Sequence, residues 1–180
     1  KLDAMSDTQK QCLQLTFGLL LSELPSSNQQ VRKNAQSSLE LIAELTGAPL
    51  ASLLKPFQKS HISVIFSRNL SQIGVRAQIG FLDALSFCIA LDGVLPMEDE
   101  LFATLQKALD LTTQAEAAIE KADTTGRGSR IVIDLRTTCI ELMMNAMSLK
   151  AMHEPQHTEL RNAIVSMFFK SLTYKAEAVL

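Results

Sequence analysis

The chain has 180 residues, of which 47% are hydrophobic and 20% charged, and its formal net charge is −2 at pH 7. This hydrophobic content excludes global disorder, and the near-neutral charge excludes an overall electrostatic attraction to nucleic acid or to an anionic membrane. With one Tyr and no Trp, the chain lacks the aromatic residues that β-strands favour. The composition therefore predicts an all-α fold.

The N-terminal part is predicted to form one helical hairpin. A first helix is expected over about residues 6–24, ending before Pro25, because the residue before a proline is pushed out of the α region. Asn28 can cap a second helix, and Gly47 followed by Pro49 can end it. The short link between the two helices forces them to run antiparallel.

Helices of unequal length are predicted in the middle of the chain. A short helix over residues 50–54 is interrupted by Pro56, another is expected over 57–66, and residues 67–74 are expected to form a loop. Helical periodicity resumes over residues 75–91, where Gly80 costs about 1 kcal/mol relative to Ala. The helix expected over residues 98–121 is weakly apolar from residue 115 onward and is predicted to fray there.

The C-terminal part is predicted to hold two more helices after a loop at residues 123–129. One helix is expected from residue 129 to about 151, and the last begins near Gln156, after Pro155. Residues 129–172 are therefore expected to form a second hairpin-like pair. The apolar stripe of its first helix consists of Leu135, Cys139, Leu142, Ala146 and Leu149.

An arginine recurs just inside the start of three of these helices. The pattern reads Val31-Arg32-x-x-Ala35-x-x-x-Leu39-x-x-Ile42, then Leu135-Arg136-x-x-Cys139-x-x-x-Met143-x-x-Ala146, then Leu160-Arg161-x-x-Ile164-x-x-x-Phe168. It is typical of the inner helix of a HEAT-like repeat, and the unequal spacing indicates degenerate repeats. The sequence thus predicts a HEAT-like α-solenoid of stacked antiparallel helix pairs.

Residues 1–180 are expected to form one helical-repeat segment of a larger protein, because the chain starts at Lys1 without a Met. The approximate repeats are residues 6–47, 50–91, and 98–151 with 156–180.

Three blocks resemble the TRRAP/Tra family of very large HEAT-repeat pseudokinases. The first is residues 31–47, followed by Leu53-Leu54-Lys55-Pro56. The second is Arg76-Ala77-Gln78-Ile79-Gly80-Phe81-Leu82-Asp83, followed by Ser86-Phe87-Cys88 and Leu91. The third is Leu135-Arg136-Thr137-Thr138-Cys139 with Met167-Phe168-Phe169-Lys170-Ser171-Leu172. The second block is the most specific, whereas the first is shared by many HEAT proteins.

The resemblance implies a nuclear, non-catalytic scaffold that organises SAGA-type histone acetyltransferase complexes and presents surfaces to transcriptional activators. The implied partners are subunits of a coactivator complex and activators, with no direct nucleic acid, membrane or small-molecule substrate. Nothing matches a family active site, so no catalytic, cofactor or metal residue is predicted. A generic HEAT-repeat adaptor from another pathway and a small all-α enzyme remain alternatives.

Several residues suggest chemistry when taken one at a time. His153 and His157 have a helical metal-ligand spacing, but Pro155 between them disfavours that helix, so they are interpreted as exposed loop histidines. His61 stands alone and is interpreted as a packed or surface histidine. Gly126-Arg127-Gly128 lacks the third glycine of a dinucleotide-binding loop and is interpreted as a connector. Ser129 is a candidate phosphorylation site at a helix start.

The arginines, methionines and cysteines are each expected to have a structural role. Arg32, Arg76, Arg136 and Arg161 are expected to bridge to an acidic side chain or a carbonyl of a neighbouring repeat rather than to bind nucleic acid. Met143, Met144, Met147 and Met152 are expected to fill the core rather than to form an adaptable binding surface. Cys12, Cys88 and Cys139 are expected to be buried thiols in a reducing compartment.

Overall fold

The computed structural model describes residues 5–63, 69–91, 98–123 and 130–177, and every regular element in these ranges is helical. The α-helices are α1 (Asp7–Glu23), α2 (Gln29–Thr46), α3 (Leu50–Leu54), α5 (Val75–Ala90), α6 (Glu98–Asp123), α7 (Arg130–Ala146) and α8 (Thr158–Glu177). Short 3₁₀ or π turns form η2 (Lys55–Phe57), η3 (Gln58–Ile62), η4 (Leu70–Gln72), η5 (Lys150–His153) and η6 (Pro155–His157). The prediction of an all-α fold is confirmed.

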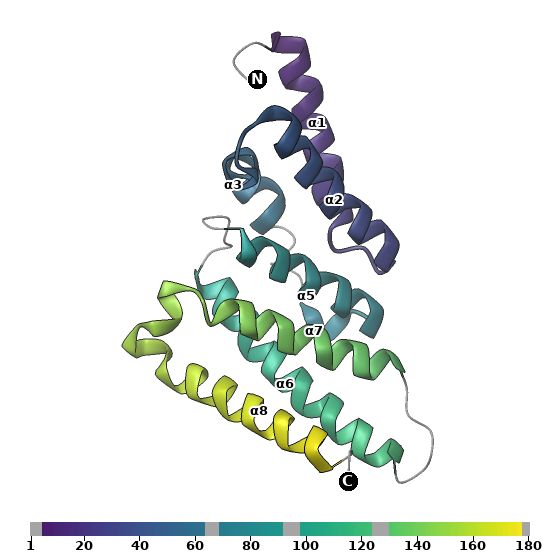
Figure 1. Ribbon diagram of the computed structural model, residues 1–180, viewed down its shortest axis with the longest axis vertical. Helices are drawn as coiled ribbons and strands as arrows, with labels where there is room; N and C mark the ends of the chain where they lie inside the picture. The colour runs from purple at the N-terminus through teal and green to yellow at the C-terminus, as the bar shows by residue number, and fades with distance from the viewer. Residues whose placement is uncertain (1–4, 64–68, 92–97, 124–129, 178–180) are drawn as a thin grey trace.

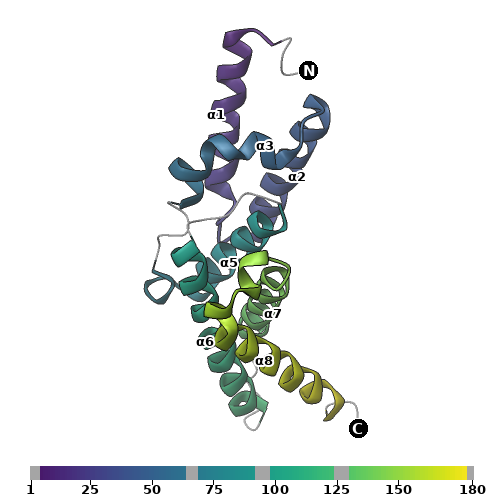
Figure 2. The same cartoon turned by 90° about the vertical axis from the view of Figure 1, so that its left-hand side faces the viewer.

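The helices are stacked along one long axis, approximately in chain order (Figure 1). α1 and α2 lie near one end and α8 lies at the other, and the side view shows the same succession (Figure 2). An elongated stack in which each helix packs on near neighbours is the arrangement of a solenoid.

The first hairpin forms as predicted, with capping residues at both its helix starts. Ser6 and Gln9 form a capping box at the start of α1, and the Asn28 Oδ1 accepts a hydrogen bond of 2.9 Å from the Gln30 backbone N–H at the start of α2. α2 ends at Thr46 and is capped by Gly47, whose φ of 66° lies in the left-handed region where glycine has no Cβ penalty.

Pro56 does not stop the helical path as predicted but changes its type. α3 passes directly into the 3₁₀ turn η2, which contains Pro56, and then into the π turn η3. A proline lacks the N–H that the α pattern needs, so a change of hydrogen-bond register lets the chain continue coiling. The predicted loop at residues 67–74 contains the 3₁₀ turn η4, whose first residues are held by Asn69. Residues 64–68 lie outside the described ranges.

Two helix boundaries differ from the prediction. α6 remains helical to Asp123, and Ala115 and Glu116 on it are buried, so the predicted fraying is wrong. The cause is tertiary: this end of α6 packs against α7 and carries a polar bridge to α8. α7 ends at Ala146 rather than near residue 151, and the turn that follows places Met152 in the core.

α7 packs along two helices at once, α5 and α6 (Figure 1). It runs antiparallel to α6, and the Asn145 side-chain amide on α7 donates a 2.6 Å hydrogen bond to the Ser86 hydroxyl on α5. The expected pair at residues 129–172 is therefore part of a larger stack, in which α7 has its main contacts with the two helices before it. The boundaries proposed for the repeats remain a prediction.

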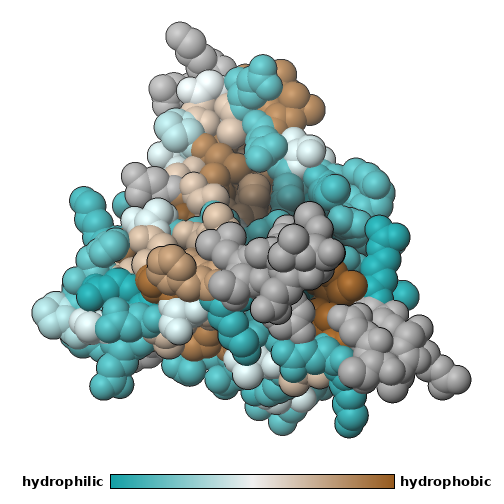
Figure 3. All heavy atoms as spheres, turned by 60° about the horizontal axis from the view of Figure 1, so that its bottom comes forward, coloured by the Kyte–Doolittle hydropathy of each residue, from teal (hydrophilic) through white to brown (hydrophobic). Residues whose placement is uncertain are grey.

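One continuous apolar core runs through the stack. It includes Phe17, Leu39, Leu82, Leu105 and Leu142, which come from five different helices. The face seen in Figure 3 shows several apolar patches surrounded by hydrophilic residues. None of the helices in the described ranges is long and apolar enough to cross a membrane.

Candidate partner-binding groove

Arg32 joins the first hairpin to α5. Its Nε donates to the Asp83 Oδ2 at 2.8 Å, and its Nη1 donates to the Ser26 carbonyl oxygen at 2.8 Å. The Arg32 side chain is only 6% exposed and the Asp83 side chain is 35% exposed, so the guanidinium is shielded from water while the carboxylate is partly solvated. Shielding makes a charge-assisted hydrogen bond stronger than at an exposed site, provided that its donors are satisfied.

The α1–α2 turn also touches the α5 backbone at Gly80. A Cβ at this position would lie 2.4 Å from the Ser26 carbonyl oxygen and 2.6 Å from the Pro25 carbonyl oxygen. Only glycine fits at this position, because the two backbones approach each other so closely. The lower helix propensity of glycine is therefore accepted in α5 so that this contact can form.

The most specific block of the family resemblance consists largely of packing positions. Gln78 is buried, and its amide donates a 2.8 Å hydrogen bond to the Leu70 carbonyl oxygen of η4. Gly80 and Asp83 make the contacts with the first hairpin described above. These residues hold α5 against the elements on either side of it.

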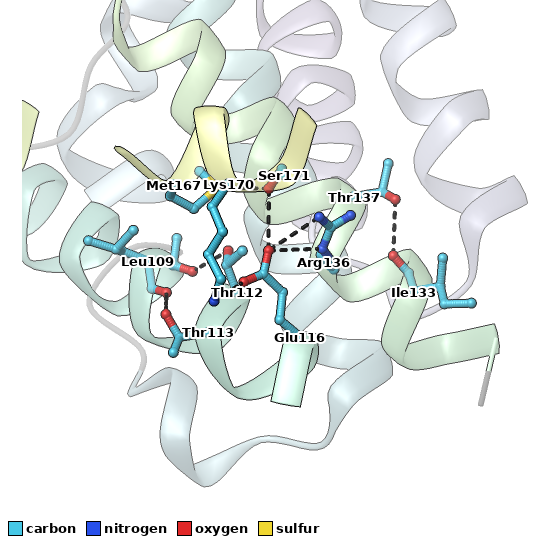
Figure 4. A network of polar contacts seen from close by, with 11 residues as sticks. Leu109, Thr112, Thr113, Glu116, Ile133, Arg136, Thr137, Met167, Lys170 and Ser171 are labelled. Carbon is cyan, nitrogen blue, oxygen red and sulfur yellow. Dashed lines mark hydrogen bonds and ion pairs between the residues drawn. The ribbon is translucent and has the colours of Figure 1, made fainter. Parts of the chain in front are cut away.

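Glu116 joins three helices at the other end of the stack (Figure 4). Its Oε1 accepts hydrogen bonds from the Arg136 Nε at 3.3 Å and the Arg136 Nη2 at 3.2 Å, and from the Ser171 hydroxyl at 3.3 Å. The Lys170 Nζ lies 3.4 Å from the Glu116 Oε2. The Glu116 side chain is 6% exposed, so α6 holds a buried carboxylate whose partners come from α7 and α8.

The predicted role of the repeat arginines is confirmed for Arg32 and Arg136, which pair with acidic side chains of other helices. Arg161 also reaches a carbonyl, donating to the Met152 oxygen at 3.2 Å in the connection before α8. Arg76 is different because it is exposed. It lies at the wall of a groove.

This groove is a cavity of about 1080 Å³ between α2, α5 and α7. The N-terminal ends of these three helices lie at the same edge of the stack (Figure 1). At that edge the groove is lined by Lys33, Arg76 and Arg130, which are all exposed. Farther along α7 it is lined by Asp134 and Glu141, which are also exposed.

The charges in the groove fall into two groups. Arg32 and Asp83 also line it, but they are already paired with each other. Among the ion pairs of the described residues, none involves Lys33, Arg76, Arg130, Asp134 or Glu141. The groove thus offers three cations at one end and two anions along α7, all available to a partner.

The histidines are placed by packing. His61 stacks edge-on against Phe57 with ring centroids 5.5 Å apart, as expected for a packed histidine. His153 is exposed, as predicted, and one of its ring nitrogens lies 3.1 Å from the Met147 carbonyl oxygen. His157 differs from the prediction: it stacks on Phe102 of α6, with centroids 3.4 Å apart and an interplanar angle of 9°. The described residues contain no group of three or more His, Cys, Asp or Glu that could hold a metal ion.

The methionines and cysteines divide by burial. Met143 and Met152 are fully buried, as the core interpretation predicts, whereas Met144 is 59% exposed. Burial raises the pKa of the Cys88 and Cys139 thiols to about 12. For the third thiol the prediction is wrong, because Cys12 is exposed on α1. Gly126-Arg127-Gly128 and Ser129 lie outside the described residues.

Sequence reasoning missed most of the groove. Lys33, Asp134 and Glu141 were not distinguished from other surface charges, because they come from helices that are far apart in the chain. A signal was present on α7, where polar residues follow each other at helical spacing. They are Arg130, Asp134, Thr137, Thr138 and Glu141.

The fold and its inter-helix bridges define a segment of an α-solenoid built from degenerate helical repeats. The chain belongs to the family described as the Tra1 HEAT repeat ring region, whose sequence pattern matches residues 1–180. The predicted HEAT-like solenoid and the resemblance to the TRRAP/Tra family are thereby confirmed.

Three relatives illustrate the similarity. The chain is 29% identical over 170 residues to the SAGA complex/NuA4 acetyltransferase complex subunit TRA1 of Saccharomyces cerevisiae, a match that covers 92% of this chain and 4% of that protein. It is 28% identical over 159 residues to the Schizosaccharomyces pombe subunit Tra1, covering 87% of this chain and 4% of that protein. It is 27% identical over 129 residues to the transformation/transcription domain-associated protein of Danio rerio, covering 67% of this chain and 3% of that protein.

Proposed function

We propose that this chain is a non-catalytic scaffold segment of a nuclear transcription coactivator subunit. It helps to organise a histone acetyltransferase complex and presents surfaces to the other subunits and to transcriptional activators. Two of its relatives are named as subunits of the SAGA and NuA4 complexes, which supports this class of partner. The relatives are about 25 times longer than the matched region, so the segment is one part of that scaffold.

The main observation in support of this proposal is that the buried charged residues are paired between helices. Arg32 and Glu116 are the buried charged residues of the described ranges, and each one bridges to other helices. Bridges of this kind fix the spacing and angle between successive helices, and a scaffold acts through that geometry. They support a structural role over the small all-α enzyme, which would need such groups to converge on a substrate.

A generic HEAT-repeat adaptor has the same physical basis, and the names of the relatives favour the coactivator. The subunits that co-purify with the full-length protein distinguish a generic adaptor from a coactivator scaffold.

The test replaces the bridging arginines in the full-length protein. In a variant with Arg32→Ala and Arg136→Ala, we expect fewer acetyltransferase-complex subunits to co-purify, because the helix stack loses two fixed spacings. The acetyltransferase activity per recovered catalytic subunit should be unchanged. A matched control changes Lys10→Ala and Lys150→Ala, which are exposed charges on α1 and η5.

An unchanged subunit composition, with the variant shown to be folded, would contradict the scaffold role. A loss of activity per catalytic subunit would contradict the non-catalytic role.

A further inference from the structure

We propose that the groove between α2, α5 and α7 binds an extended protein segment that carries acidic residues at one end and basic residues at the other. This inference rests on the proposed scaffold function, because it names the chemistry of a partner that the scaffold would hold. It adds a defined surface, a charge pattern and a direction for that partner.

The acidic end of the partner is specified by the cations at one edge of the groove. Lys33 is in the first turns of α2, Arg76 is the second residue of α5, and Arg130 is the first residue of α7. The other groove arginine, Arg32, already has both Asp83 and the Ser26 carbonyl as acceptors. Three exposed cations from three helices that meet at one cavity therefore lack an anionic partner within the described part of the chain.

The basic end is specified by α7. Asp134 and Glu141 line the same cavity and lie seven residues apart, which is about two helical turns on one face. These carboxylates repel a polyanion lying along the groove. A nucleic acid backbone, with a negative charge at every phosphate, thus fits the groove worse than a peptide with both signs of charge.

The length of the groove fits a short extended peptide. From Arg130 to Glu141, α7 rises about 16 Å at ~1.5 Å per residue, which matches about five residues of extended chain. Ile79 and Ile131 are half-buried in the groove wall and provide apolar contact for the bound segment. Opposite charges at the two ends fix the direction of the bound segment, since the reverse placement sets like charges against each other.

The test measures peptide binding to the purified full-length protein by fluorescence anisotropy. The probe is a labelled six-residue peptide with three glutamates at one end and three lysines at the other. A second peptide has the same composition with the charges alternating, a third has glutamate in place of lysine, and the fourth probe is a single-stranded DNA of similar length.

We expect the block-charged peptide to bind most tightly. Its binding should weaken as the salt concentration is raised, because salt screens exposed charges.

Two groove variants should distinguish the contribution of the cationic end of the groove from that of the anionic residues on α7. Lys33→Glu with Arg76→Glu should lower the affinity for the block-charged peptide about tenfold, because attraction becomes repulsion at the acidic end of the peptide. Asp134→Lys with Glu141→Lys should also lower the affinity for this peptide, but should raise the affinity for the all-acidic peptide. The control, Lys10→Glu with Lys150→Glu, changes the same kinds of charge outside the groove and should leave binding unchanged.

A photo-crosslinker on the peptide gives a second measurement that does not depend on the variants. Placed at the acidic end, it should label α2, α5 or the first turn of α7, and placed at the basic end it should label α7 near Glu141.

Equal affinity for the block-charged and alternating peptides, tighter binding of DNA, or an equal loss in the control variant would overturn the proposal. The groove variants should lose at most the one partner whose segment occupies the groove, whereas the Arg32 and Arg136 variant loses several complex subunits, so a failure here is distinct from a failure of the scaffold function.

Discussion

Replacing Arg136 with methionine tests whether the Glu116 bridge holds the C-terminal helices together. The substitution keeps most of the side-chain length and removes the charge that faces the Glu116 carboxylate. Glu116 then remains buried, with only the Ser171 hydroxyl and the exposed Lys170 ammonium beside it. A buried carboxylate that loses its main partner destabilises the folded state, because it cannot recover its hydration.

The expected loss is about 2–3 kcal/mol in the free energy of unfolding. Removal of one partner of a buried ion pair costs about 3–5 kcal/mol in general. Here the two Arg136 bonds measure 3.3 and 3.2 Å, longer than in tight charge-assisted pairs, and Lys170 still lies 3.4 Å from the other oxygen. Both facts place the expected loss below or at the low end of the general range. Against a typical total stability of about 5–15 kcal/mol, the change is large.

The measurement is urea unfolding of the 180-residue chain, followed by far-UV circular dichroism because the chain has no Trp. The double variant Glu116→Leu with Arg136→Met removes both charges, and we expect it to recover most of the lost stability. If Arg136→Met alone costs less than about 0.5 kcal/mol, or if the double variant is no more stable than the single one, the bridge does not have the role assigned to it.

Four further perturbations test other parts of the fold. Gly80→Ala should lower the melting temperature in spite of the better helix propensity of alanine, because the new Cβ meets two carbonyl oxygens; Gly18→Ala, whose Cβ meets only the His61 ring at 3.2 Å, is the control, and a higher melting temperature for Gly80→Ala would contradict the close approach. Gly47→Ala should cost about 1–2 kcal/mol in urea unfolding, because its φ of 66° is unfavourable for any residue with a Cβ, and an unchanged midpoint would be inconsistent with that conformation. A thiol reagent should label Cys12 alone in the folded chain and all three cysteines in denaturant, and rapid labelling of more than one native thiol would disprove the burial. Raising the pH from 8 to 10 should lower the urea midpoint, because the two buried thiols have a folded pKa of about 12 against an ordinary 9.0 and so ionise first in the unfolded chain. A variant with both buried cysteines changed to alanine should show a weaker pH dependence.

Local sequence signals determined the helices of the first hairpin. Asn28, Gly47 and the proline at residue 25 act within a few residues of their own position, so their effect does not depend on the rest of the fold. The repeated arginine pattern predicted a solenoid for a similar reason. An apolar stripe at helical spacing can be buried only against a neighbouring helix, whichever helix that is.

The sequence is least informative where contacts between distant residues, or the lack of them, decide the outcome. The end of α6 is weakly apolar and was expected to fray, yet Glu116 on it is held by residues of two later helices. Gly80 costs helix stability locally, and only the backbone of the first hairpin explains why no larger residue fits. Cys12 belongs to an apolar stretch but lies on the face of α1 that no described helix covers.

The sequence by itself therefore determined the helical class, most helix starts and the family, because these depend on short-range periodicity and capping chemistry. The tertiary structure decided which charges are used internally and which remain available. Arg32 and Arg76 follow apolar residues in similar positions of their helices, but the stack pairs the first with Asp83 and leaves the second exposed at the groove. The physical reason is that a charge's partners are set by distances between helices, and those distances exist only after the helices have packed.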